Sequence, residues 1–198
     1  EGGYRINGSK LYITNSPLAD FMMLAARTAP DLKPWAISLF IVPLPNAAVQ
    51  ISHLKKEGLK GSETGLIYIE DLFVPDDHLL GEQEGTYPVI LESLTENRVG
   101  VAASVLGVAK GAYQEALSYA RTRIVAGKPI LDYQAVAHRL ADMVTDIEAA
   151  HWMVYHGAWK VDQGTIDHAA AAKIKLFASE AALRVTEGAM RVLGGASI

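Results

Sequence analysis

Residues 94–120 read LTENRVGVAASVLGVAKGAYQEALSYA, and the spacing of their apolar side chains decides the fold of the second half of the chain. These side chains recur mostly at three- and four-residue steps, as on one face of an α-helix: Leu94, Ala102, Leu106, Ala109, Tyr113, Ala116 and Ala120. The same period returns twice downstream: at Val136, Leu140, Met143, Ile147, Val154 and Ala158, and at Ala171, Ile174, Ala178, Ala181, Val185 and Met190. Gly127-Lys128-Pro129 and Asp162-Gln163-Gly164 separate the three segments. Long helices joined by short loops predict an antiparallel helical bundle.

Before residue 85 the apolar runs are short, and turn residues separate them. Tyr4–Ile6 and Leu11–Ile13 flank Asn7-Gly8, a dipeptide that favours a tight hairpin turn. Further strands are predicted at Phe21–Ala26, Ile37–Val42, Val49–Ile51 and Ile67–Val74. Strands at this density predict a small β-barrel or sandwich.

The predicted fold class is therefore α+β: a small β-barrel or sandwich domain followed by an antiparallel helical bundle. We expect the β-domain at residues 1–84, the bundle at residues 85–198, and a linker at Gly81–Gly85. The bundle is predicted to be incomplete, because Gly194-Gly195 ends its third helix and only three residues follow.

The composition argues against several classes of protein. The 198 residues include 18 Lys+Arg and 22 Asp+Glu, a net charge of −4, and no basic run that would bind nucleic acid. No uncharged apolar stretch reaches the roughly 18–20 residues of a membrane span. Cysteine is absent, which excludes disulfides, thiolate metal sites and cysteine nucleophiles. The chain begins at Glu1, and no targeting segment is recognisable.

Common catalytic and metal motifs are scarce. Glu148-Ala149-Ala150-His151 matches half of the Glu-x-x-His pattern of di-iron bundles, but no second copy exists. Gly61–Gly65 lacks the order of a nucleophile elbow, and neither a dinucleotide-binding nor a P-loop pattern occurs. We expect no metal site, and a metal-binding bundle stays an alternative.

Four stretches in order give the chain a resemblance to the acyl-CoA dehydrogenase family. They are GSKLYITN (residues 8–15) with Ala19-Asp20, LKGSETG (59–65) with Glu70-Asp71 and Val74-Pro75, Asn97-Arg98 through Tyr119–Arg123 to Gln134, and Leu193-Gly194-Gly195. The resemblance covers nearly the whole chain. It implies part of the middle β-domain and the first part of the C-terminal helical domain of a longer flavoenzyme.

The resemblance implies FAD as cofactor and an acyl-CoA thioester as substrate. In this family a carboxylate removes the α-proton while the β-hydrogen leaves as hydride to flavin N5. Tyr12, Ile13 and Thr14 match the strand beside the flavin ring, with the Thr14 hydroxyl bonding N5 and Tyr12 as an aromatic wall.

The resemblance places five further cofactor residues in the bundle. Arg123 matches the arginine that binds the FAD pyrophosphate of a neighbouring subunit, although this chain reads Arg-Ile-Val-Ala-Gly where Arg-x-x-Phe-Gly is usual. Gln134, Arg191, Gly194 and Gly195 match positions that hold the adenosine half across the dimer, and Arg191 stands where glutamine is common.

Thr95, Asn97 and Arg98 match positions near the thioester arm of the substrate. Some branches of the family carry the catalytic glutamate at the position of Asn97, and asparagine cannot act as a base. No catalytic base is therefore assigned in this chain, and we expect it further along the polypeptide.

The implied partners are electron-transfer flavoprotein as acceptor and other copies of the chain in a homotetramer. The implied compartment is the cytoplasm, or the mitochondrial matrix in a eukaryote. Three alternatives stay open: an acyl-CoA oxidase or flavin monooxygenase of the same superfamily, a metal-binding bundle, and a non-catalytic interaction module.

Overall fold

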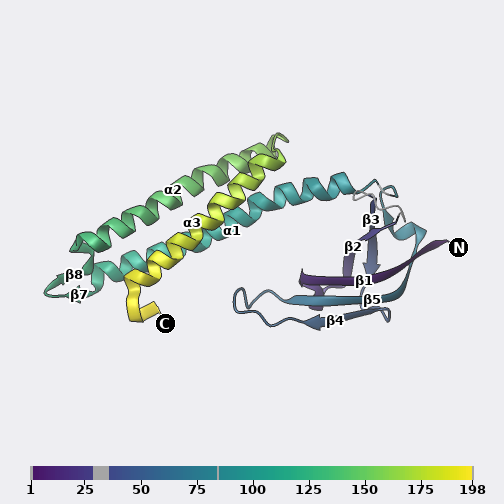
Figure 1. Ribbon diagram of the computed structural model, residues 1–198, viewed down its shortest axis with the longest axis horizontal. Coiled ribbons are helices and arrows are strands. Elements are labelled where there is room, and N and C mark those ends of the chain that lie inside the picture. The colour runs from purple at the N-terminus through teal and green to yellow at the C-terminus, as the bar shows by residue number, and fades with distance from the viewer. Residues whose placement is uncertain (1, 29–35, 84, 198) are drawn as a thin grey trace. The chain divides into compact units, whose positions relative to one another are not determined.

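The computed structural model describes residues 2–28, 36–83 and 85–197. The chain divides into two compact units, Glu1–Ile90 (unit 1) and Leu91–Ile198 (unit 2). Glu84, inside the expected linker, lies outside the described residues. Strands occupy the first unit and long helices the second (Figure 1). The predicted α+β class, strands followed by a helical bundle, is confirmed.

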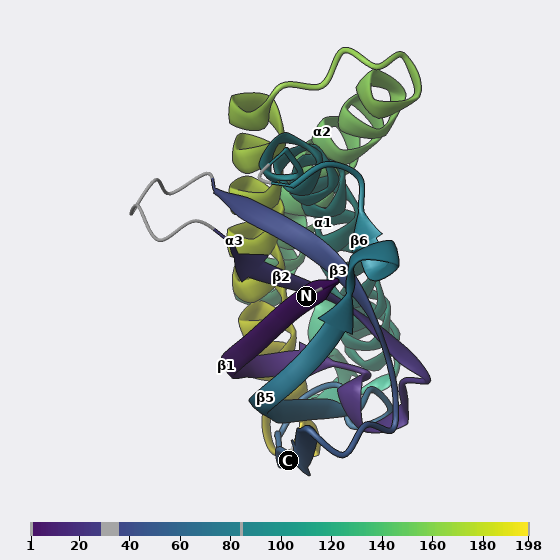
Figure 2. The same ribbon diagram turned by 90° about the vertical axis from the view of Figure 1, so that its right-hand side faces the viewer.

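Unit 1 contains two three-stranded antiparallel sheets. Their strands are β1 (Gly3–Thr14), β2 (Phe21–Arg27), β3 (Ile37–Pro43), β4 (Val49–His53), β5 (Thr64–Pro75) and β6 (Leu79–Leu80). One sheet has the order β1-β5-β4 and the other β2-β3-β6. β5 runs between β1 and β4, and β3 lies beside β2 (Figures 1 and 2). The described strands close no barrel, so the sandwich half of the expectation fits better.

The core of unit 1 lies between the two sheets. Alternate residues of β3 and β5 point into it, and Phe40, Ile67 and Leu72 are at most 1% exposed. Alternation places every second side chain of a strand on one face, so these residues meet there and bury their apolar area.

The Asn7-Gly8 hairpin predicted from the sequence is wrong. β1 continues unbroken through both residues and pairs with β5, with a shift of register between Ile6 and Gly8. The Asn7 side chain accepts a hydrogen bond from the Asp71 backbone N at 2.7 Å. The bulge lies in β5, where Glu70 and Asp71 stand opposite Asn7. Pairing with a distant strand thus outweighs the local preference of Asn7-Gly8 for a turn.

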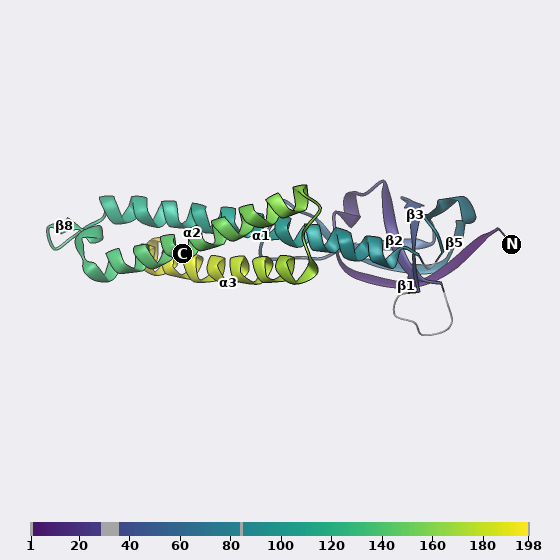
Figure 3. The same ribbon diagram turned by 90° about the horizontal axis from the view of Figure 1, so that it is seen from above.

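Unit 2 holds three long helices that share one core. α1 spans Tyr87–Thr122 and begins in unit 1, α2 spans Gln134–Asp162, and α3 spans His168–Leu193. α2 and α3 run side by side (Figure 3). Two glycines permit their close approach: a Cβ on Gly157 would meet Ile174 Cδ1 at 2.6 Å, and one on Gly188 would meet Met143 Sδ at 3.0 Å.

The helical periods predicted the helices but not every buried position. Leu94 is 47% exposed, Met190 is 56% exposed, and Ala158 is also exposed. Among the described residues no helix is long and apolar enough to cross a membrane.

Candidate functional site

The segment Tyr12–Thr14 forms an exposed ridge at the end of β1. Between Lys10 and Ile13 the register of β1 against β5 shifts again. Tyr12 sits in this bulge with φ 60° and is 73% exposed. A positive φ is costly for a bulky side chain, so the surrounding pairing must hold this conformation in place. The bulge turns the Tyr12 ring outward, while Ile13 packs toward the core of unit 1.

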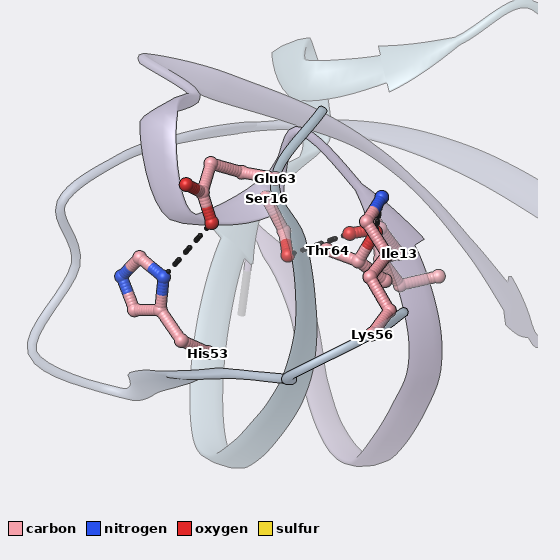
Figure 4. A network of polar contacts seen from close by, with 6 residues as sticks. All are labelled: Ile13, Ser16, His53, Lys56, Glu63 and Thr64. Carbon is pink, nitrogen blue, oxygen red and sulfur yellow. Dashed lines mark hydrogen bonds and ion pairs between the residues drawn. The ribbon is translucent and has the colours of Figure 1, made fainter. Parts of the chain in front are cut away.

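Two small residues behind the ridge hold it in place. The buried Ser16 hydroxyl donates to the Ile13 carbonyl at 2.9 Å (Figure 4). A Cβ added to Gly65 would collide with Ser16 Oγ, so glycine at this position leaves room for the serine. The backbone of Thr14 pairs with that of Thr64 in β5, and Asn15 N donates to Glu63 O at 2.8 Å.

A polar network continues along the same edge. Lys56 Nζ donates to Thr64 Oγ1 at 2.9 Å, and His53 Nδ1 lies 3.1 Å from Glu63 Oε2 (Figure 4). The first contact ties the segment after β4 to the first residue of β5, and the second ties the last residue of β4 to the residue before β5. Neither Ser16 nor this network carries a local sequence signal, because the partners meet only in the folded sheet.

The ridge offers what the isoalloxazine ring of a flavin needs. Thr14 is exposed, and within the described residues its hydroxyl makes no hydrogen bond. A free hydroxyl has one donor and two acceptor sites, which suits the N5 position of a flavin in either redox state. The exposed Tyr12 ring supplies a flat apolar surface two residues away. The predicted flavin residues therefore fit the group.

One end of the bundle carries the other predicted cofactor residues. α1 is followed by a short hairpin of β7 (Ile124–Val125) and β8 (Lys128–Pro129), whose turn residues Ala126 and Gly127 both have positive φ. This hairpin, the first residues of α2 and the last turn of α3 lie at the same end of the bundle (Figure 1). Arg123 is exposed there, and in the described parts of the chain no hydrogen bond or ion pair holds its guanidinium.

Tyr133 makes two contacts with this hairpin, a hydrogen bond and a cation–π contact. The Tyr133 hydroxyl donates to the Val125 carbonyl at 2.8 Å, and Lys128 Nζ lies 4.2 Å from the centre of the Tyr133 ring. Gln134 follows directly as the first residue of α2, with an exposed side chain. The hairpin thus holds Arg123 and Gln134 on one rigid connection.

At the end of α3 the two predicted glycines are open to a ligand, whereas the predicted arginine is paired with another side chain. Gly194 caps the helix with φ 57°, and a Cβ on either Gly194 or Gly195 would meet nothing within 4 Å. Their backbone is open to a ligand. Arg191 instead forms an ion pair with Glu187 one turn earlier on α3. The Glu187 carboxylate would compete with a phosphate for this guanidinium.

A polar groove between α2 and α3 was not predicted from the sequence. Arg184 donates to both carboxylate oxygens of Asp146 at 2.9 Å, which raises the pKa of Arg184. Arg139 and Arg191 also line the groove, a cavity of about 160 Å³. The Arg184 pair links α3 to α2 across the groove.

The three predicted substrate residues do not share one surface. Thr95 is 3% exposed and donates to the Leu91 carbonyl at 2.8 Å. His168 Nδ1 is bonded to the same hydroxyl, and because the hydroxyl proton points to Leu91, His168 must be the donor. Asn97 lies about 200° around the helix from Thr95 at roughly 100° per residue, and it is exposed. Arg98 is half-buried.

His168 was not predicted as a partner of Thr95, since 73 residues separate the two. Next to it, Asp167 caps α3 by accepting the Ala170 backbone N–H at 2.6 Å. That hydrogen bond lowers the pKa of Asp167. Together these contacts fix the start of α3 against α1.

Both polar residues of the Glu-x-x-His half-motif, Glu148 and His151, contact other side chains. Glu148 Oε1 accepts from Trp152 Nε1 at 2.7 Å, and His151 Nδ1 lies 3.1 Å from Lys110 Nζ. Across residues 2–28, 36–83 and 85–197, no three His, Asp or Glu side chains are grouped to hold a metal ion.

Two family models of known proteins together match nearly the whole chain. The family model for "Acyl-CoA dehydrogenase, middle domain" matches residues 1–72, and that for "Acyl-CoA dehydrogenase, C-terminal domain" matches residues 85–198. The solved butyryl-CoA dehydrogenase of Megasphaera elsdenii superimposes with a TM-score of 0.94 at 34% identity, covering 98% of this chain and 51% of that one. A structure described as PigA with FAD and proline superimposes with a TM-score of 0.93 at 30% identity, covering 100% and 52%.

A curated relative from Acetobacterium woodii, the Caffeyl-CoA reductase-Etf complex subunit CarC, is 37% identical over 193 residues, 97% of this chain and 51% of its own length. The chain spans about half the length of the curated relatives it matches. Both family models match in the order of the two units. The chain belongs to the acyl-CoA dehydrogenase family.

Proposed function

We propose that this chain is part of an FAD-dependent acyl-CoA dehydrogenase, which removes the α-proton of an acyl-CoA and transfers the β-hydrogen as hydride to flavin N5. The observation that carries the proposal is the ridge Tyr12–Thr14, with its strained aromatic residue and a free hydroxyl two positions later. Membership in the family and the likeness to butyryl-CoA dehydrogenase support the reaction class.

Bound FAD would supply the hydride acceptor. In this proposal the chain's own residues orient the ring: Thr14 donates to or accepts from N5, and Tyr12 packs beside the ring. Ser16 and Gly65 keep Thr14 in place through the Ile13 carbonyl. A preorganised hydroxyl does not have to reorient as charge develops at N5, which is why its position affects the rate.

The end of the bundle that carries the β7–β8 hairpin would hold the phosphate and adenosine parts of a neighbouring subunit's FAD. Arg123 is free to pair with a pyrophosphate, and Gly194 and Gly195 leave their backbone open to the adenosine half. Gln134 presents its amide from the same end. Ala126 stands where relatives carry phenylalanine, so this corner offers less apolar contact to the cofactor.

The substrate side is less complete in this chain. Asn97 and Arg98 would contact the thioester arm, and Thr95 would act there only if His168 released it. Neither Asn97 nor Thr95 can accept the α-proton as a general base at neutral pH. The proposal therefore places the base on a part of the enzyme outside residues 1–198.

We further propose electron-transfer flavoprotein as the acceptor and a homotetramer as the assembly. The first is supported by the printed name of the Acetobacterium woodii relative, which is a subunit of an Etf complex. The second follows the family resemblance, as does a location in the cytoplasm or the mitochondrial matrix.

A flavin oxidase or monooxygenase of the same superfamily is the second candidate. It is favoured by the likeness to PigA, whose structure is described with FAD and proline rather than with a thioester. Reaction with dioxygen after flavin reduction separates the two: a dehydrogenase reoxidises slowly in air, and an oxidase rapidly.

Flavin binding tests the shared part of both candidates. The full-length protein, passed through gel filtration after incubation with FAD, should retain visible flavin absorbance in a stoichiometric amount. Residues 1–198 alone should retain little, since the site needs residues outside them and a second subunit. Tight stoichiometric flavin on residues 1–198, or none on the full-length protein, would contradict the proposal.

A further inference from the structure

Thr14 and Thr64 are neighbours on the outer face of the sheet β1-β5-β4. In β5 the side chains of Ile67 and Ile69 are buried in the core of unit 1, so alternation along the strand directs Thr64 to the opposite face. Thr14 lies directly opposite Thr64 in the register of β1 against β5. Directly opposed residues project from one face of a sheet, with Cβ atoms about 4.5–5.5 Å apart. The hydroxyl proposed to bond flavin N5 therefore has the Thr64 side chain beside it.

Lys56 brings a positive charge to this pair of threonines. Its Nζ donates to Thr64 Oγ1 at 2.9 Å, and Thr64 is only 9% exposed (Figure 4). The Lys56 side chain is half-buried, so water solvates its ammonium group only in part. Withdrawing a charge from water costs free energy unless another charged or polar group compensates it.

Among the described residues no carboxylate compensates the charge of Lys56. The ion pairs of unit 1 join Arg5 with Asp71 and His53 with Glu63. An ammonium group has three N–H donors, and in the part of the chain that the structure describes Lys56 uses one of them, on a neutral hydroxyl. A negative charge that forms near Thr14 would therefore meet a cation that no other side chain neutralises.

We propose that Lys56 is a positioning residue that holds a positive charge beside the flavin ring and so favours the reduced cofactor, an inference that rests on the proposed function because Thr14 places the ring. A hydride brings one proton and two electrons to the ring as the β-C–H bond breaks and the N5–H bond forms. The ring thus gains one unit of negative charge. Lys56 gives up no proton in this step, and its charge acts on the ring across Thr64 and Thr14.

The charge is close enough to affect the reduction. A hydrogen bond from Lys56 to Thr64, the step between the two strands and a hydrogen bond from Thr14 to N5 together span about 10 Å. At about that distance, and at an effective dielectric constant of about 20, two unit charges change an equilibrium constant by roughly tenfold. The protein should therefore favour reduced over oxidised FAD about tenfold more with Lys56 than without it.

The midpoint potential of the bound FAD measures this preference. In the FAD-loaded full-length protein, Lys56→Met should lower the ratio of affinities for reduced and oxidised FAD about tenfold, which makes the potential about 30 mV more negative for a two-electron couple. Chemical reduction beside a reference dye needs no acyl-CoA, so the readout does not depend on turnover. Lys56→Arg keeps the charge and should stay within about threefold of the parent ratio.

Lys55→Met is the matched control. It removes the same charge one residue away, from an exposed side chain that bonds no other side chain in the described part of the protein. Water and salt screen an exposed charge, so this variant should change the ratio by less than about threefold. Equal shifts in Lys55→Met and Lys56→Met would show an effect of net charge alone and would overturn the proposal, as would an unchanged potential in Lys56→Met.

Thr64→Val tests whether the threonine holds the ammonium group in place. It nearly keeps the size of the side chain and removes the acceptor of the Lys56 hydrogen bond. The variant should lower the same ratio, and adding Lys56→Met to it should lower the ratio further by less than about threefold. A full effect of Lys56→Met in the Thr64→Val protein would overturn the positioning by Thr64. A parent protein that binds no FAD would defeat the proposed function together with this role, whereas FAD bound at a potential indifferent to Lys56 would defeat the role alone.

Discussion

Replacing Gly65 by alanine tests how the ridge Tyr12–Thr14 is held. The new methyl would overlap Ser16 Oγ and lie 3.1 Å from Ser52 O and 3.2 Å from Ile51 Cγ2. Ser16 is 4% exposed and would have to rotate away, which breaks its hydrogen bond to the Ile13 carbonyl. The substitution therefore acts on the ridge through Ser16.

The expected cost follows from two terms. Overpacking a filled site typically costs about 1–3 kcal/mol, and a lost hydrogen bond costs about 1 kcal/mol. Gly65→Ala should therefore destabilise the protein by about 2–4 kcal/mol. Ser16→Ala loses only the hydrogen bond and should cost about 1 kcal/mol.

A double-mutant cycle separates these terms. In Ser16→Ala/Gly65→Ala the colliding oxygen is gone, so the double variant should be at least about 1 kcal/mol more stable than the sum of the single costs predicts. Urea unfolding followed by circular dichroism measures all four proteins. Additive costs, or a Gly65→Ala variant as stable as the parent, would refute the role given to Ser16.

The remaining predictions concern the cofactor, the bundle and pH. In the full-length enzyme Thr14→Ala should keep the fold but slow flavin reduction by acyl-CoA about ten- to a hundredfold, because one hydrogen bond at a reacting centre is worth roughly 1–3 kcal/mol; reduction at the parent rate in stopped flow would remove Thr14 from the site. Asn97→Ala should leave that rate nearly unchanged, and a collapse would show that α1 carries the proton transfer. Arg184→Met should lower the free energy of unfolding by about 1 kcal/mol, a value kept small because the Arg184 side chain is half exposed; Asp146→Leu should cost about as much, and a cycle without coupling between them would count against the pair. Asp167 has a pKa lowered from 3.8 in the folded chain, so its capping contribution is present above that pH and is lost as the pH falls below it. Asp167→Asn should flatten this acid limb in urea unfolding at several pH values, and an unchanged limb would contradict the cap.

The helices could be predicted from the sequence because their apolar period is local. The three predicted segments lie within α1, α2 and α3, and each helix extends beyond its segment at both ends. Which face is buried was harder to predict. α3 is apolar on two sides, and Met190, which follows Val185 by five residues rather than three or four, lies on its exposed side.

The β-unit shows the opposite limit. Asn7-Gly8 is a strong local turn signal, yet Asn7 bonds to Asp71 across the sheet and β1 stays extended. Contacts between residues far apart in sequence decided this outcome, and no local pattern reports them. The same holds for Thr95, whose partner His168 lies on another helix.

The cofactor residues were inferred from motif resemblance. The structure adds which of their side chains are free of other partners and which are paired. The positive φ of Tyr12 and the unpaired hydroxyl of Thr14 could not be read from LYIT, because both depend on the register with β5. Arg123 matches an arginine of the family, whereas Arg191 stands where glutamine is common and is paired with Glu187. Pairing along one helix is readable in principle from the four-residue spacing of Glu187 and Arg191.

Anaerobic titration of the FAD-loaded full-length protein with acyl-CoA thioesters tests the central claim most directly. The account predicts that the visible flavin absorbance bleaches with at least one saturated acyl-CoA, and that the matching 2-enoyl-CoA appears in equal amount. A protein that binds FAD tightly but stays oxidised with short, medium, long and branched acyl-CoAs alike would contradict it.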